Sequence, residues 1–139
     1  MRVLRPGFLV RVIYALCLIG ATINHIRAVA AHGWLPAYLP QVTAAYWASL
    51  TFLDPLVVTL LFIRPRAGIA ATFGIILSDV VHNLWFVVTY SHGASVPRVI
   101  ANSPFLISQI GFLLFVALTA SIAWRNSPRK PTGRVLIAR

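Results

Sequence analysis

Four long apolar segments, separated by short polar or proline-containing connections, dominate the hydrophobic pattern of the chain. They cover about residues 8–31, 44–63, 67–90 and 105–124. A bilayer core about 30 Å thick is crossed by about 20 helical residues at a rise of 1.5 Å each. The alternation of apolar and polar residues that is typical of membrane β-strands is absent. The pattern therefore predicts an all-α membrane protein, a bundle of four transmembrane helices.

The composition agrees with a single membrane domain. Hydrophobic residues make up 59% of the chain and charged residues only 10%, whereas a soluble domain has about 25% charged residues. We expect residues 1–125 to form the four-helix domain and residues 126–139 to form a basic, disordered cytoplasmic tail. The connection around Pro65 is so short that the second and third spans must be antiparallel neighbours.

The charge is strongly asymmetric, with 12 basic residues against 2 acidic ones. Ten of the basic residues fall on one side of the predicted bundle, namely Arg2, Arg5, Arg11, Arg64, Arg66, Arg125, Arg129, Lys130, Arg134 and Arg139. Cytoplasmic flanks are enriched in Lys and Arg, so both termini are predicted to be cytoplasmic. With the richness in arginine, alanine and valine, we expect a protein of a bacterial inner membrane. The cations flank apolar spans rather than a soluble face, so the expected partners are membrane lipids and not nucleic acid.

The outer side of the predicted bundle is rich in aromatic residues, which would form a belt at the membrane interface. They are Trp34, Tyr38, Tyr46, Trp47 and Tyr90.

Residues 1–30 also resemble a signal peptide, with Ala28-Val29-Ala30 as a cleavage site. Cleavage would leave three spans and an outer N-terminus. Both alternatives are compatible with the sequence.

Both acidic residues, Asp54 and Asp79, fall in the middle of predicted spans. Ionisable groups at this depth cost about 2.5 kcal/mol or more, so they mark candidate sites. Asp79 is followed by His82, Asn83 and Phe86 at helical spacing, which predicts one shared face. Asp54 precedes Pro55, so we expect a kink there, or a broken helix whose second half is capped by Asp54.

Counting residues from the basic side places the polar groups of all four spans about 15–24 Å into the bilayer. They therefore share a layer in its outer half. We expect them to meet in one polar cavity formed chiefly by Asn24, His25, Asp54, Asp79, His82 and Asn83. Arg27 falls near this layer and could pair with Asp79 or extend outward.

The leading functional hypothesis is a cavity that binds or transfers a small ligand, cation or proton. The alternative is a structural or accessory membrane subunit, dimeric or bound to another protein, whose polar cluster only holds helices together. A metal site of His25, Asp79 and His82, or a haem bridged by the two histidines, is a lesser alternative. An acid/base enzyme acting on a lipid is another. No nucleophile elbow, phosphate loop or C-x-x-C motif is present, so the sequence assigns no reaction and no cofactor.

Overall fold

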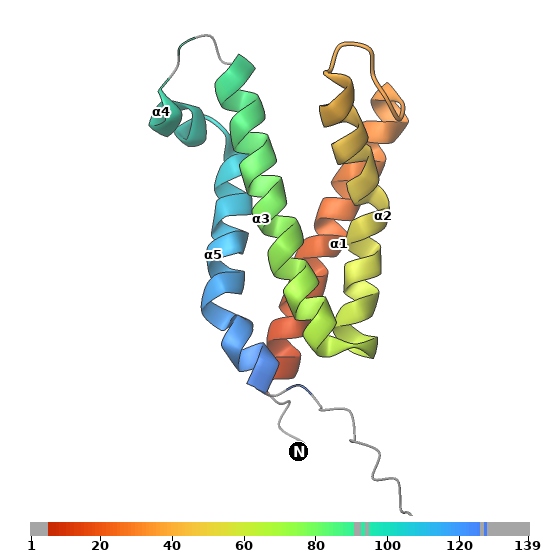
Figure 1. Cartoon of the computed structure of the whole chain (residues 1–139), viewed down its shortest axis with the longest axis vertical. Coiled ribbons are helices and arrows are strands. Elements are labelled where there is room, and N and C mark those ends of the chain that lie inside the picture. The colour runs from red at the N-terminus through yellow and green to blue at the C-terminus, as the bar shows by residue number, and fades with distance from the viewer. Residues whose placement is uncertain (1–5, 91–92, 94, 126, 128–139) are drawn as a thin grey trace, which may run out of the picture.

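The computed structural model describes residues 6–90, 93, 95–125 and 127 and is built from helices (Figure 1). In chain order these are α1 (Pro6–His32), α2 (Gln41–Ile63), α3 (Pro65–Tyr90), α4 (Val96–Ala101) and α5 (Pro104–Arg125). All but the short α4 are long and apolar enough to cross a membrane. The predicted all-α, four-helix membrane fold is therefore confirmed. The predicted tail at 126–139 lies outside the described residues, apart from Ser127.

The ends of the long helices follow from local sequence. Pro6, Pro65 and Pro104 each occupy the first position of a helix, where a missing N–H costs nothing. Pro55 is different, because it lies inside α2, which continues through it from Gln41 to Ile63. The expectation of a broken helix with Asp54 as its cap is wrong. In hydrocarbon a break would leave several backbone groups without partners, whereas the proline removes only one hydrogen bond.

The four long helices form a closed ring of neighbours. α1 packs against α2 and α5, and α3 packs against the same two helices. The predicted antiparallel pairing of α2 with α3 across Arg64 is confirmed. Pro6 and Arg125 lie at the same end of the bundle, which we call the basic end (Figure 1). α4 and the connection from α1 to α2 lie at the opposite end, the far end.

The half of the bundle near the basic end is tightly packed. Tyr14 of α1 is fully buried there, and its hydroxyl oxygen lies 3.2 Å from the carbonyl oxygen of Val116 and 2.7 Å from Oγ1 of Thr119 in α5. The surrounding core consists of small and branched apolar side chains, including Leu18, Val57, Leu61, Ile69, Ile76, Val80 and Ala123. Tyr14 thus ties α1 to α5 through hydrogen bonds inside an otherwise apolar core.

Two arginines connect helices at the basic end. Arg11 of α1 is only 8% exposed, and its guanidinium donates to the carbonyl of Leu61 in α2 at 2.9 Å and to that of Gly7 at 3.2 Å. Arg66 of α3 lies over the indole of Trp124 in α5, 5.6 Å from the ring centre. Each of these two charges therefore has a partner on a neighbouring helix.

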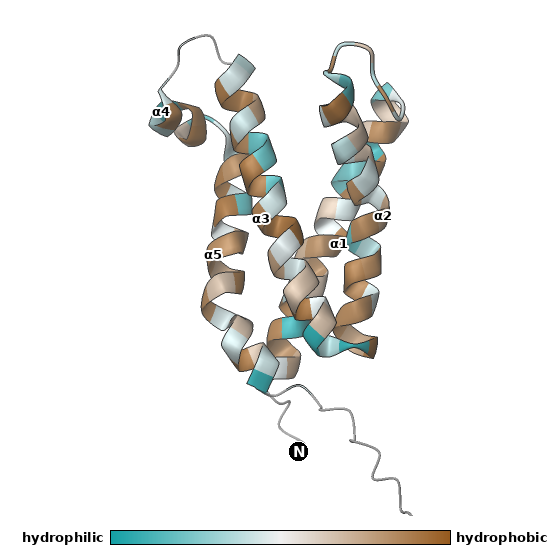
Figure 2. Cartoon of the chain, viewed as in Figure 1, coloured by the Kyte–Doolittle hydropathy of each residue, from teal (hydrophilic) through white to brown (hydrophobic). Residues whose placement is uncertain are grey.

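Toward the far end, the α1–α2 pair and the α3–α5 pair diverge (Figure 1). Figure 2 shows hydrophilic residues both at the basic end and on the far halves of α1, α2 and α3, separated by a mostly hydrophobic middle. Most buried polar side chains beyond the packed core belong to this diverging half, including Thr43, Asp54, Asp79, Asn83 and Gln109. The fold thus places a packed apolar core and a polar half end to end.

A substitution at Gly68 tests how closely α2 and α3 approach one another. A Cβ at this position would overlap backbone atoms of Leu60 and Leu61, whereas one at Gly74 of the same helix would meet nothing within 4 Å. We expect Gly68→Ala to lower the free energy of unfolding by about 1–3 kcal/mol through overpacking. Gly74→Ala, the matched control, should not lower it. Thermal unfolding in detergent measures both, and equal effects would contradict the close packing.

Candidate functional site

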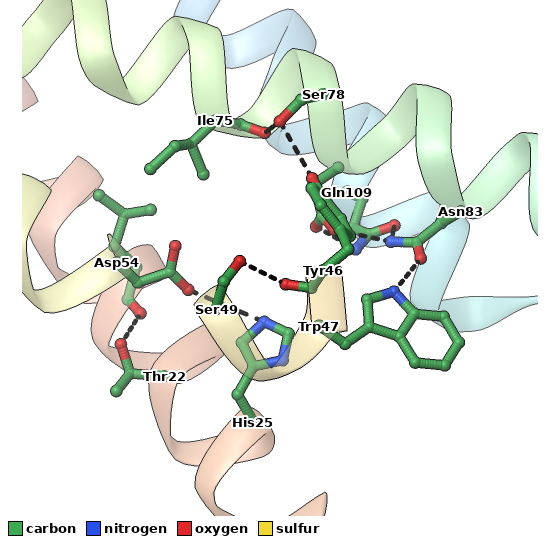
Figure 3. Close-up of polar contacts among 12 residues, drawn as sticks. Thr22, His25, Tyr46, Trp47, Ser49, Asp54, Ile75, Ser78, Asn83 and Gln109 are labelled. Carbon is green, nitrogen blue, oxygen red and sulfur yellow. Dashed lines mark hydrogen bonds and ion pairs between the residues drawn. The ribbon is translucent and has the colours of Figure 1, made fainter. Parts of the chain in front are cut away.

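The polar residues of the far half separate into two groups. The first, which we call the amide network, consists of Trp47, Asp79, Asn83 and Gln109. Figure 3 labels Trp47, Asn83 and Gln109. The indole of Trp47 donates to Oδ1 of Asn83 at 2.7 Å. Nδ2 of Asn83 lies 2.8 Å from Oδ1 of Asp79 and 3.2 Å from Oε1 of Gln109. Nε2 of Gln109 donates to Oδ2 of Asp79 at 2.5 Å.

The amide network holds three helices together. Trp47 belongs to α2, Asp79 and Asn83 to α3, and Gln109 to α5. Each oxygen of the Asp79 carboxylate accepts a hydrogen bond from a side-chain amide. Asp79 is 8% exposed and Asn83 4%, so water contributes little to them. The carboxylate of Asp79 is therefore satisfied within the protein, and it links α3 to α5.

The second group is a pair between α1 and α2. Oδ2 of Asp54 lies 3.8 Å from Nε2 of His25, which is within ion-pair range when the imidazole is protonated but too long for a hydrogen bond. Asp54 is only 2% exposed. Over the described residues, no hydrogen bond reaches its carboxylate. Figure 3 shows Asp54 and His25 facing one another, apart from the amide network. Asp54 is thus a buried acid that the protein leaves largely unpaired.

A cavity of about 270 Å³ lies between α1, α2, α3 and α5 at this level. We call it the acidic chamber. Its polar lining residues are Asn24, His25, Asp54, Asp79, Ser108 and Gln109. Both acids of the chain line it, and none of its lining residues is Lys or Arg. A positively charged or hydrogen-bond-donating group would therefore be favoured inside it, and an anion would be repelled.

His82 does not line the acidic chamber. Its ring lies among aromatic side chains, with centroids 4.3 Å from Tyr46, 6.3 Å from Trp47 and 5.6 Å from Trp85. A helix turns about 100° per residue, so His82 points about 60° to one side of Asp79, while Asn83 points about 40° to the other. The sequence spacing placed all three on one face, but the structure directs Asn83 toward Gln109 of α5 and His82 toward Tyr46 of α2.

The structure does not gather the proposed metal ligands. Within residues 6–90, 93, 95–125 and 127, no three His, Cys, Asp or Glu side chains are placed to hold a metal ion. His25 is beside Asp54, Asp79 is bonded to two amides, and His82 is among aromatic rings. His25 and His82, the two histidines of the haem alternative, likewise belong to separate clusters.

Three other residues bear on the predicted polar cluster. Trp47, expected in an interfacial belt, lies inside α2 and donates into the amide network. Gln109 of α5 belongs to the amide network but is not among the six predicted site residues. Its depth, about 24 Å when counted from Arg125, is the signal that could have identified it. Arg27 is exposed on α1 and forms no ion pair with Asp79 in the described structure. Of the six site residues, the chamber therefore includes Asn24, His25, Asp54 and Asp79.

Fold and site together define a multi-pass helical membrane protein with a polar network and an acidic chamber in one half of the bundle. Comparison with protein-family models, with curated proteins and with solved structures finds no match to this chain. The residues of the site alone therefore carry the functional argument.

The two acids should differ in their contribution to stability. In Asp79→Asn, at least one donor of the network must face another donor whichever way Asn83 and Gln109 turn, because the amide oxygens of these two residues already accept from Trp47 and Asn83. We therefore expect unfolding to become easier by about 1–3 kcal/mol. Asp54→Asn removes no hydrogen bond and should leave stability equal or higher. Thermal unfolding of the two variants in one detergent measures this difference. A larger loss in Asp54→Asn would contradict the division into two groups.

Proposed function

We propose that the acidic chamber binds or transfers a small cationic ligand or a proton, with Asp54 as the anionic contact. The carrying observation is the Asp54 carboxylate, which is 2% exposed yet receives no hydrogen bond within the described residues. A buried charge without a partner is costly, and ionisable groups inside membrane spans are retained mainly for function. A cation admitted to the chamber would supply the missing partner.

His25 would complete the contact from the opposite helix. Its Nε2 faces Asp54 at 3.8 Å, and its side chain is 12% exposed. A gap of this length lets a proton move between the two side chains, and a donor group placed beside the gap, in the chamber, can bond to both atoms without moving either helix. A carboxylate and an imidazole placed in this way can exchange a proton or hold a cation. We propose that His25 is the second contact in the site. Asn24, on the chamber wall, would supply a neutral polar contact.

A structural function is supported by a different observation and applies to different residues. The amide network connects α2, α3 and α5 through side chains that are already satisfied. Hydrogen bonds between membrane helices contribute about 0.6 kcal/mol each, so several together are a plausible device for holding a bundle. If the protein were only a structural subunit, Asp54 would be expected to join such a network, and it does not.

The test of the proposed function compares cations in detergent. We expect the unfolding temperature to rise with increasing ammonium, n-propylammonium, sodium or calcium for at least one of these ions. Asp54→Asn should abolish the rise, because it removes the anionic contact while preserving the shape of the side chain. Thr59→Val is the matched control, since it removes a hydroxyl from the exposed side of the same helix and should keep the response. A response that persists in Asp54→Asn would overturn the proposal.

We also propose that the protein spans the inner membrane of a bacterial cell and that its basic end faces the cytoplasm. Arg11, Arg64, Arg66 and Arg125 lie at that end, which supports this orientation through the preference of Lys and Arg for the cytoplasmic side.

Single cysteines test the orientation. Cys17 is the only cysteine of the chain and is replaced by serine. Arg98→Cys, exposed on α4 at the far end, should react with a membrane-impermeant maleimide in intact cells. Arg64→Cys, exposed at the basic end, should react only after the cells are lysed. The reverse pattern would contradict the orientation.

A further inference from the structure

A second cavity adjoins the acidic chamber. It has a volume of about 380 Å³, and we call it the apolar chamber. Asn24, His25 and Phe105 line both chambers. The two volumes therefore meet at His25, directly beside the Asp54 carboxylate.

The walls of the apolar chamber are mainly hydrocarbon and aromatic. Its largest apolar contributors are Trp47, Phe86, Val87, Phe105 and Leu106. The rings of Trp47 and Phe86 pack edge to face at 5.1 Å, and the indole is fixed by its hydrogen bond to Asn83. One wall is therefore rigid before any ligand arrives. Ligand sites of a few hundred Å³ with apolar walls and a few polar groups are typical for drug-sized molecules.

The pairing of the two chambers restricts the ligand. A bare ion or a small hydrophilic cation would contact Asp54 but would leave the apolar chamber without an occupant. A neutral alcohol with a long chain would fill the apolar chamber but would leave the buried acid uncompensated. Anionic lipids and fatty acids would meet two carboxylates, Asp54 and Asp79. Only a molecule with a cationic head and an apolar body matches both chambers.

The surroundings of the chambers fit a ligand dissolved in the membrane. Phe105, which lines both, is 49% exposed on the surface of the bundle. Phe105 lies in the first turn of α5, far along that helix from Thr119, which contacts Tyr14 of α1 in the packed half. At the far end, where α5 begins, the α3–α5 pair has diverged from the α1–α2 pair (Figure 1). An amphiphile in the bilayer could therefore reach the apolar chamber from the side.

We infer that the ligand is an amphiphilic amine, with its ammonium group bridging Asp54 and His25 from the chamber side and its hydrocarbon body against Trp47 and Phe86. This inference rests on the proposed function, because it uses Asp54 as the anionic contact, and it adds the chemical class of the ligand.

The test uses three probes and the full chain in nanodiscs of zwitterionic lipid, with empty nanodiscs as the background. Dodecylamine carries both features, dodecanol has the same chain without the charge, and n-propylamine has the head with almost no chain. Tryptophan fluorescence reports occupancy, because Trp47 lines the apolar chamber, and Trp47→Phe identifies its share of the signal. We expect saturable binding of dodecylamine with an affinity at least about tenfold above that of either other probe.

Two variants of α3 separate the chamber from general effects of the helix. Val87→Phe adds a ring inside the apolar chamber, and it should weaken dodecylamine binding at least about tenfold while leaving any n-propylamine response intact. Val81→Phe makes the same change at a position that is 59% exposed on the surface of the bundle and should have no effect. If Val87→Phe fails to fold, the comparison of the three probes decides alone.

The possible results distinguish the inference from the proposed function. Equal affinities for dodecylamine and n-propylamine, both lost in Asp54→Asn, would overturn the amphiphile and leave the cation site standing. Dodecanol bound as tightly as dodecylamine would overturn the cationic head. Dodecylamine bound equally well by the wild type and by Asp54→Asn would overturn the proposed function and the inference together.

Discussion

The structure depends on one constraint: in hydrocarbon, backbone polar groups must find partners inside the protein, and a buried polar side chain without a partner is costly. At the basic end Arg11 meets it through the carbonyls of Gly7 and Leu61, and Tyr14 meets it through α5. These bonds join α1 to both of its neighbours. The packed half of the bundle is therefore an apolar core whose few polar groups also serve as ties between helices.

The same constraint gives opposite results at the two acids. Asp79 is surrounded by amides from two helices and satisfied on both oxygens, so it behaves like the polar ties of the packed half. Asp54 has the same chemistry and similar burial and lines the same chamber, but within the described residues its carboxylate meets only one imidazole, at 3.8 Å, and accepts no hydrogen bond. On the neighbouring helix α3, the protein satisfies both oxygens of a buried carboxylate, whereas on α2 the carboxylate of Asp54 accepts no hydrogen bond within the described residues. That contrast is stronger support for a binding site than the presence of two acids alone.

The fold could be predicted almost completely from the sequence, because the thickness of a bilayer fixes the length of each apolar span. The site could be predicted only in part. Helical spacing grouped Asp79 with His82, but spacing cannot tell which neighbouring helix each side chain faces, and α2 and α5 lie on different sides of α3. Trp47 was predicted to lie in the interfacial belt because Trp and Tyr near the end of a span are enriched at the membrane–water interface. Only the three-dimensional packing showed it inside the amide network.

The position of the chambers follows from the packing of the two halves. The glycine contact between α2 and α3 at Gly68 and the contact of Tyr14 with α5 both fall in the half near the basic end. Helices drawn together there and joined by longer connections at the far end diverge, and the space between them must be filled by side chains or by a ligand. Aromatic rings fill part of it around His82. The remaining space lies beside Asp54. Apolar side chains at this position would have filled the space without the cost of burying a carboxylate. We therefore regard the cavity as a site and not as a packing defect.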